Sequence, residues 1–260
     1  MAEETQYAAN TGMVTISTAN SNLDGTGTLG TVLTSENNGT LIKTVTIKSQ
    51  GSTTEGMVRL FVYDGTNTRL LKEIEVPAVT QSAIFPSFET IVSLNFSLKA
   101  GYSLKASTEN AETFNVIAEA LNWSYYATSV RTDTTEYTAN TGSGNISTAN
   151  GNLNGIGTIV QILTASGSGT SIESITTKCQ VSPPKGMVRL FIDDNNGHVL
   201  LFREVPIKPI TKSSTATSFE NTLVFENDFE LQAGYSISAA TQFGNTFSIA
   251  VEGLDWTYLP

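Results

Sequence analysis

Hydrophobic and polar residues alternate along several short segments of the chain. Val58, Leu60 and Val62 lie on one face of an extended strand, and the residues between them lie on the other. Asp64-Gly65 follows directly, a dipeptide that favours a tight hairpin turn. Residues 69–76, which also mix apolar and polar side chains, are predicted to form the returning strand, and Pro77 ends it. The pattern therefore predicts a β-hairpin.

Similar segments recur along the chain, and no segment shows a convincing helical period. Threonine, serine, valine and isoleucine are frequent, and glycine and asparagine interrupt the segments, which is typical of strands joined by turns. Because helical crossovers are missing, we expect antiparallel pairing of about eight strands per half of the chain. The further strands are expected at residues 13–17, 27–34, 41–48, 89–98, 102–107, 114–123, 172–179, 199–205, 220–231, 235–240 and 247–258.

The chain of 260 residues contains the same pattern twice. Gly56-Met57-Val58-Arg59-Leu60-Phe61 returns unchanged at 186–191, a shift of 130 residues. Solenoid repeats are only about 20–50 residues long, so this shift indicates a duplicated domain. We expect domains at 1–127 and 135–260, joined by a short polar linker at 128–134. The predicted fold is all-β, with two tandem homologous antiparallel β-sandwich domains of jelly-roll-like form.

Charge and composition narrow the class of protein. The chain has 24 acidic and 14 basic residues, a formal net charge of −10. This balance disfavours nucleic acid and anionic membranes as partners. The acidic first residues lack the apolar segment of a signal peptide, so we expect synthesis in a cytoplasm. With one cysteine, no disulfide can form within the chain.

Residues that could carry chemistry occur in only one of the two copies. His198 and Cys179 stand where the first copy has Thr68 and Ser49. One histidine and one cysteine do not provide the ligands of a zinc site, and no nucleophile elbow accompanies His198. The acidic turn at 193–196 does not have EF-hand spacing, and ordinary turn chemistry explains it. We therefore predict no catalytic, cofactor-binding or metal-binding residues and no enzymatic activity.

Two glutamates and one arginine recur in both copies. Two carboxylates about 5–10 Å apart could hydrolyse a glycosidic bond. The favoured alternative is structural, because an arginine within an apolar strand needs a carboxylate partner. The candidate ion-pair residues are Arg59, Glu89 and Glu119 in the first copy and Arg189, Glu220 and Glu252 in the second.

Aromatic residues end the last predicted strand of each copy. They can close a core, dock on a neighbouring molecule or stack on a sugar. These candidate interface or glycan-binding residues are Trp123, Tyr125, Trp256 and Tyr258.

The units shared by the copies resemble a module of structural proteins of tailed bacteriophages, of the crAss-like type. These units are "YTANTG", "ISTAN.NL.G.GT", "GMVRLF", "SFE" and "L.AGYS". The resemblance spans nearly the whole chain and implies a capsid auxiliary, decoration or head-associated role without catalytic residues. It implies a virion location and other virion proteins as partners, above all the major capsid protein, with self-association as a further expectation. The alternative is a carbohydrate-binding or host-adhesion module displayed on the virion.

Overall fold

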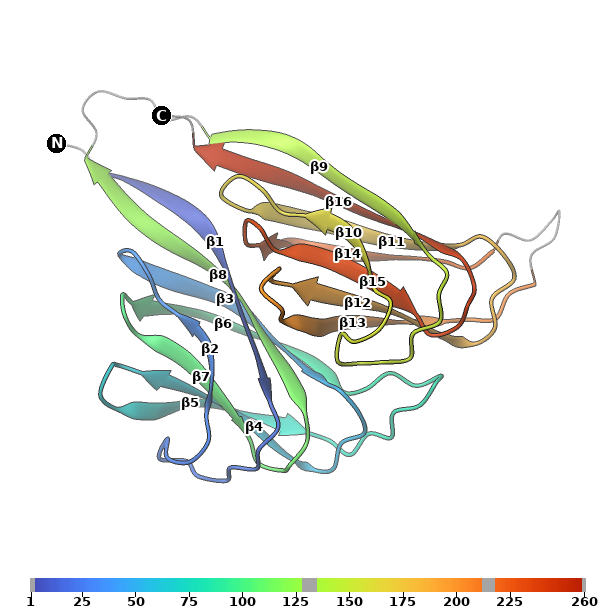
Figure 1. Ribbon diagram of the computed structural model, residues 1–260. Helices are drawn as coiled ribbons and strands as arrows, with labels where there is room; N and C mark the ends of the chain where they lie inside the picture. Colours follow the sequence, from blue (N-terminus) through green and yellow to red (C-terminus); the bar gives the residue numbers. More distant parts are fainter. Residues whose placement is uncertain (1–2, 128–134, 212–217, 259–260) are drawn as a thin grey trace. The chain divides into compact units, whose positions relative to one another are not determined.

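The chain folds almost entirely into β-strands. The computed structural model describes residues 3–127, 135–211 and 218–258, and these contain sixteen strands and no helix (Figure 1). Among the described residues, no helix is long and apolar enough to cross a membrane. Contacts between Cα atoms divide the chain into two compact units. The first consists of Met1–Thr80, Ser87–Glu136 and Tyr258–Pro260, and the second of Gln81–Pro86 and Tyr137–Thr257.

The first unit contains two four-stranded sheets, and each pair of neighbouring strands is antiparallel. One sheet has the order β1-β8-β3-β6 and the other β2-β7-β4-β5. The strands are β1 (Glu3–Ile16), β2 (Gly30–Thr34), β3 (Gly39–Ser49), β4 (Gly56–Tyr63), β5 (Thr68–Val76), β6 (Glu89–Lys99), β7 (Ser103–Thr108) and β8 (Phe114–Ala127).

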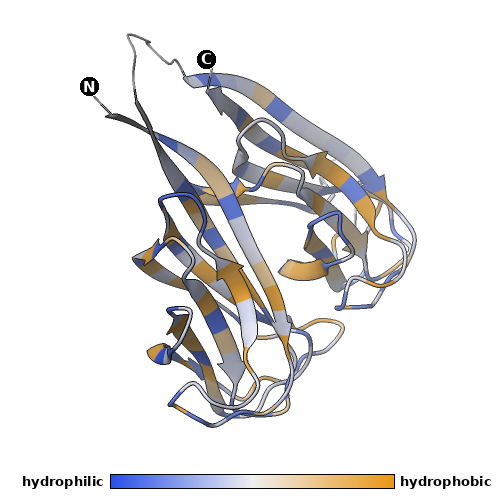
Figure 2. Cartoon of the chain, turned by 60° about the vertical axis from the view of Figure 1, so that its left-hand side comes forward, coloured by the Kyte–Doolittle hydropathy of each residue, from blue (hydrophilic) through white to orange (hydrophobic). Residues whose placement is uncertain are grey.

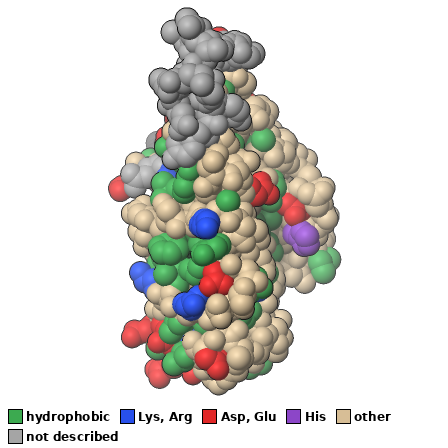
Figure 3. Space-filling view, turned by 90° about the vertical axis from the view of Figure 1, so that its left-hand side faces the viewer, with side chains coloured by type: hydrophobic (Ala, Val, Ile, Leu, Met, Phe, Trp, Pro, Cys, Tyr) green, Lys and Arg blue, Asp and Glu red, His purple; other side chains and the backbone are tan. Residues whose placement is uncertain are grey.

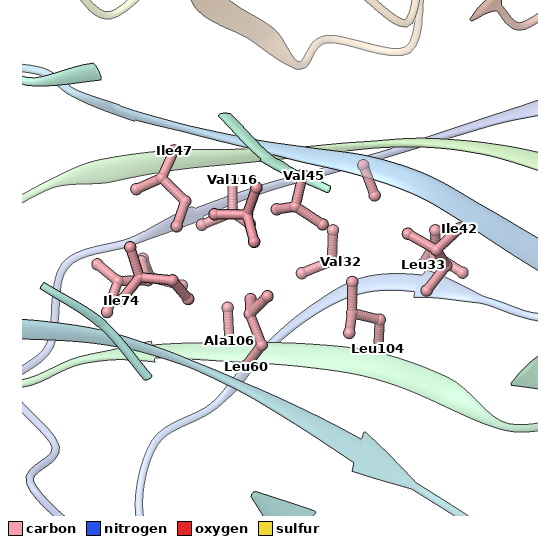
Figure 4. Close-up of a cluster of buried hydrophobic side chains, with 14 of the residues drawn as sticks. Val32, Leu33, Ile42, Val45, Ile47, Leu60, Ile74, Leu104, Ala106 and Val116 are labelled. Atoms are coloured by element: carbon pink, nitrogen blue, oxygen red, sulfur yellow. The ribbon is translucent and has the colours of Figure 1, made fainter. Parts of the chain in front are cut away.

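The hydrophobic core of the first unit lies between its two sheets. Figure 4 shows Val45 and Val116 from one sheet opposite Leu60 and Leu104 from the other. Figure 2 shows hydrophobic and hydrophilic bands alternating along the strands, which is the two-residue period of the sequence. Leu60 is therefore buried in the core, whereas its neighbour Arg59 points to the opposite face of β4.

The second unit repeats this pairing. Its sheets have the orders β14-β11-β16-β9 and β10-β15-β12-β13. Phe202 on β13 packs against Phe229 on β14, with 4.7 Å between the ring centroids, so aromatic side chains join edge strands of the two sheets. The strands are β9 (Thr135–Ile146), β10 (Val160–Thr164), β11 (Thr170–Cys179), β12 (Gly186–Asp193), β13 (Val199–Ile207), β14 (Glu220–Leu231), β15 (Ser236–Thr241) and β16 (Phe247–Tyr258).

The pairing corrects the predicted fold class. The chain is all-β, but its strands form four separate small sheets instead of the two tandem jelly-roll-like sandwiches that were expected. The alternating pattern locates strands but does not determine which strands pair, and most neighbours in these sheets are distant in sequence. The predicted linker, 128–134, lies outside the described residues, so the domain boundaries drawn from the sequence stay a prediction.

Irregular pairing recurs at matching places in the two units. In the first unit the register shifts at Thr31/Leu33, Ile42/Thr44 and Leu60/Phe61. In the second unit it shifts at Gln161/Leu163, Ile172/Ser174 and Leu190/Phe191. Such β-bulges insert a residue on one strand and change which side chains face each other.

Candidate functional site

Arg59 is a buried arginine at the centre of a polar cluster in the first unit. It is 5% exposed and lies on β4. Its Nε donates to Glu73 Oε1 at 2.9 Å, and its Nη2 lies 3.5 Å from Glu109 Oε2. A third contact runs from Nη1 to the main-chain oxygen of Asn20 at 3.4 Å. The guanidinium thus links two carboxylates to the loop that contains Asn20, which is 39 residues away in the sequence.

Arg189 holds the same place in the second unit. Its Nε donates to Glu204 Oε1 at 3.2 Å, and its Nη1 donates to the main-chain oxygen of Asn150 at 3.4 Å. Burial lowers the pKa of Arg189, while the charge of Glu204 and its hydrogen bond oppose that shift. Both side chains are almost completely buried, so this ion pair is isolated from solvent.

The asparagines in these clusters organise the loops that follow them. The Nδ2 of Asn20 donates to the main-chain oxygens of Thr26 and Thr28 at 2.9 and 3.0 Å, and its Oδ1 accepts the amide of Asn22. Asn150 makes the equivalent contacts in the second unit. A Cβ on Gly27, where φ is +82°, would lie 2.8 Å from the Asn20 amide. These contacts explain why the asparagine and the glycines recur together.

The structure does not pair either arginine with the predicted glutamates. Arg59 and Glu119 belong to different sheets, and each points away from the core, because their neighbours Leu60 and Ala118 lie in it. The pairing of Arg59 with Glu89 or Glu119 is therefore wrong, and the partners are Glu73 and Glu109. In the second unit Arg189 likewise pairs with Glu204 instead of Glu220 or Glu252.

The four predicted glutamates have partners of another kind. Glu89 lies 3.4 Å from the buried Nζ of Lys48, and Glu119 lies 2.8 Å from Nζ of Lys43. Glu220 lies 2.5 Å from Nζ of Lys178, and Glu252 accepts a hydrogen bond of 2.9 Å from the Ser174 hydroxyl. Three of the four are thus held by lysines, and these contacts tie neighbouring strands together.

The residues with catalytic chemistry lie apart. The Cys179 side chain is buried, and its sulfur contacts the main-chain oxygen of Thr246 at 3.6 Å. The exposed His198 ring lies 2.6 Å from Asp194 Oδ2 in a hairpin turn, and it is the purple side chain beside acidic atoms in Figure 3. The counterpart of Thr68 in the structure is Val199, not His198 as the sequence comparison indicated. Thr68 pairs with Tyr63 at the start of β5, and Val199 pairs with Asp193 at the start of β13. Among the described residues, no group of three or more metal-ligating side chains comes together.

The terminal aromatic residues differ between the units. Trp123 is half-buried on β8, whereas Trp256 on β16 is 7% exposed. Tyr258 is half-buried at the end of β16. The side chain of Tyr125 lies outside the described part of the structure.

Trp123 lines a hollow on the first unit, and that hollow has a volume of about 240 Å³. Its lining comes from all four strands of one sheet: Tyr7 faces Trp123 across β1 and β8, and Leu41 faces Ser97 across β3 and β6. Thr5 completes the lining. A Cβ on Gly39 would lie 2.2 Å from the Trp123 ring, so the indole lies directly over a glycine. Sequence reasoning found Trp123 but missed the other four lining residues.

Comparison with known proteins gives little on family. No protein-family model matches the chain, and no curated protein is similar to it in sequence. Among solved structures, the chain is similar to a protein in the atomic structure of Sulfolobus Turreted Icosahedral Virus, with 11% identity and a TM-score of 0.26. That similarity covers 97% of this chain and 90% of the other.

A second similar structure is the crystal structure of the STIV MCP. Its identity is 10% and its TM-score 0.27, over 98% of this chain and 97% of the other. Similarity at this level carries no argument about function.

Proposed function

We propose that the protein is a non-enzymatic structural component of a virion, acting as an auxiliary or decoration protein on a bacteriophage head. The observation that carries this proposal is what the two copies share. Both retain a buried arginine, its carboxylate partner and an asparagine-organised loop. These side chains make hydrogen bonds and ion pairs that hold strands and loops together. Such contacts stabilise a fold, which is what a structural protein requires.

The residues found in one copy only support the same proposal. The Cys179 thiol is enclosed in the core, and His198 is hydrogen-bonded to Asp194 within its own exposed turn. A duplicated enzyme would retain its reacting groups in at least one copy, arranged around a cleft. Here the histidine and the cysteine belong to different elements, and each has a local structural contact.

Its partners on the virion would be other virion proteins, chiefly the major capsid protein, with self-association between copies of the chain. The surface seen in Figure 3 mixes hydrophobic, basic and acidic side chains. Such a mixed surface fits docking onto a protein better than binding to nucleic acid, which requires a continuous basic surface. The net charge of −10 agrees with this choice of partner. After synthesis in the host cytoplasm, the chain would reside on the virion.

Quantitative mass spectrometry of purified virions tests the proposal. We expect the chain at a fixed ratio to the major capsid subunit, and we expect purified recombinant chain to rebind particles that lack it. A variable trace amount, together with no rebinding, would overturn the proposal. Turnover of a glycoside substrate that is lost in Glu119→Gln or Glu252→Gln would also overturn it.

The second candidate function is carbohydrate binding or host adhesion on the same virion. The hollow at Trp123 favours it, because half-exposed aromatic rings beside hydroxyl groups are suited to sugars. Both functions can belong to one chain, since a decoration protein can present an adhesive surface.

A further inference from the structure

The hollow at Trp123 has a definite construction. It spans the four strands of one antiparallel sheet, with Thr5 and Tyr7 two residues apart on β1 and therefore on the same face. Trp123 lies opposite Tyr7 on the neighbouring strand, and Tyr7 is 42% exposed. Because the paired strands hold these backbone positions, the aromatic and hydroxyl side chains are gathered on one face of the sheet before any ligand arrives.

We propose that this hollow binds one neutral sugar residue of a glycan. The inference rests on the second proposed function, adhesion, and gives it a site and a ligand class. The indole of Trp123 and the phenol ring of Tyr7 offer apolar faces for the C–H face of a pyranose. The hydroxyls of Thr5 and Ser97 can donate to and accept from sugar hydroxyls.

The size of the hollow favours a single ring. Its volume of about 240 Å³ is below the roughly 300–1,000 Å³ of sites for drug-sized ligands. A nucleotide or a long oligosaccharide would extend beyond it, whereas one hexose fits within it. The remaining residues of a glycan would then continue over the surrounding surface.

The charge of the lining selects among sugars. Thr5, Tyr7, Leu41, Ser97 and Trp123 are all uncharged. A sialic acid or a uronic acid would have to bring a carboxylate against this uncharged lining, on a chain with a net charge of −10. The nearest lysine in the strand register, Lys99 opposite Gly39, is exposed to solvent, so its attraction for that carboxylate is screened by water. Desolvation of that carboxylate would be unfavourable. Neutral hexoses and N-acetylhexosamines carry no such cost.

The matching positions of the second unit carry a different set of side chains. Trp256 is 7% exposed there, and Ser171 and Glu230 stand at the positions of Leu41 and Ser97. Tyr137, the counterpart of Tyr7, is 67% exposed. The duplication thus provides an internal control, because a matched substitution can be made in the unit whose corresponding residues differ.

Ligand-observed NMR on the full chain tests the proposal. The probes are glucose, galactose, mannose and N-acetylglucosamine, with glucuronic acid as the charged comparison. We expect saturable binding of at least one neutral sugar with a Kd on the order of 1 mM, and no binding of glucuronic acid. Tyr7→Ala and Trp123→Phe should weaken binding at least tenfold, whereas Tyr137→Ala should leave it unchanged.

Four results would overturn the proposal: no saturable binding of any neutral sugar, tight binding of glucuronic acid, full binding by Tyr7→Ala, or loss of binding in Tyr137→Ala. Circular dichroism of each variant separates a lost site from a lost fold. Particle rebinding is measured on the same Tyr7→Ala chain. If that chain rebinds particles but binds no sugar, the sugar site and the decoration role are both supported. If wild type rebinds particles but binds no sugar, only the sugar site fails.

Discussion

Arg59 and Arg189 occupy equivalent positions and both are buried, yet their glutamate partners differ in their access to solvent. The side chain of Glu73, the partner of Arg59, is 41% exposed, whereas that of Glu204, the partner of Arg189, is 0% exposed. Arg59 has a second carboxylate in Glu109. The corresponding residue of the second unit is Gln242. Glu109 follows Thr108, which pairs with Val58 on β4, and Gln242 follows Thr241, which pairs with Val188 on β12.

This difference shows that one motif can be stabilised in two ways. In the first unit the ion pair is screened by water, and two carboxylates share the guanidinium. In the second unit one carboxylate must compensate a fully desolvated charge. The contribution of a single glutamate to the free energy of unfolding therefore depends more on how exposed it is than on its position in the repeated sequence.

The largest expected effect comes from removing the buried carboxylate. Glu204→Gln leaves Arg189 buried without its counter-charge and should lower the free energy of unfolding of the second unit by ~3–5 kcal/mol. Glu73→Gln should cost about 1 kcal/mol or less, because Glu73 is half exposed and Glu109 remains.

Urea unfolding followed by tryptophan fluorescence measures these changes. Each unit has one tryptophan, so Trp123→Phe and Trp256→Phe backgrounds report on the units separately. Equal losses for Glu204→Gln and Glu73→Gln would contradict the comparison.

The next largest effect concerns the asparagine-organised loops. Gly157 has φ of +95°, and a Cβ there would lie 3.0 Å from the Asn150 amide. Gly157→Ala should cost roughly 2–4 kcal/mol, since backbone strain adds to disrupted hydrogen bonds. Gly65 has the same φ but open space around it, so Gly65→Ala should show the strain alone, about 1–2 kcal/mol. Equal losses in thermal unfolding would show that the asparagine contact contributes nothing.

A smaller gain is expected from making the second unit more like the first. Oε1 of Gln242 is buried and has no hydrogen-bond partner in the described structure. Gln242→Glu places a second carboxylate where Glu109 stands in the first unit, and it should stabilise the second unit by about 1 kcal/mol. The reverse change, Glu109→Gln, should destabilise the first unit by a similar or smaller amount. Loss of stability in Gln242→Glu would show that the two environments are not interchangeable.

The smallest expected effect is a difference in pH dependence between the hairpin turn at Asp194 and the one at Asp64. Burial alone would raise the pKa of Asp194, but hydrogen bonds from the His198 side chain and from the amides of Asn196 and His198 hold it below the usual value. A lowered pKa adds stability above the unfolded carboxyl value, near 4, and this stability is lost as pH falls through the folded value.

NMR of the Asn196 amide should therefore show a transition below pH 4 that is missing in Asp194→Asn. The Asp64 turn of the first unit provides the control. Hydrogen bonds from the amide of Asn67, the Arg69 side chain and the amide of Thr66 lower the pKa of Asp64 still further. Its turn should therefore persist to a lower pH, and simultaneous transitions in both turns would contradict this.

The strands were largely predictable because their signal is local. Alternation and the Asp64-Gly65 turn located β4 and β5 to within one residue. The arginine partner was not predictable in the same way. Counting outward from the turn places Lys72 opposite Arg59, but the bulge at Leu60/Phe61 shifts the pairing so that Glu73 faces it. A bulge leaves no clear mark in the alternating pattern.

Two other features depend on distant contacts. β1 begins at Glu3, ten residues before the predicted start, because its first half is polar and small and becomes a strand only by pairing with β8. At Gly12 a Cβ would lie 2.5 Å from Leu33, so this strand packs closely where the sequence shows no apolar signal. The hollow at Trp123 similarly combines residues from four strands, which no local pattern could bring together.

The repeated bulges also indicate the order in which the fold and the duplication arose. The register shift at Leu60/Phe61 has its counterpart at Leu190/Phe191, and the other two shifts recur in the same way. Three separate irregularities at matching positions are more simply inherited than acquired twice. The ancestor was therefore a single unit whose bulges were already in place, and the duplication copied a finished fold. Divergence came later, in the partners of the arginines and in the surroundings of the tryptophans.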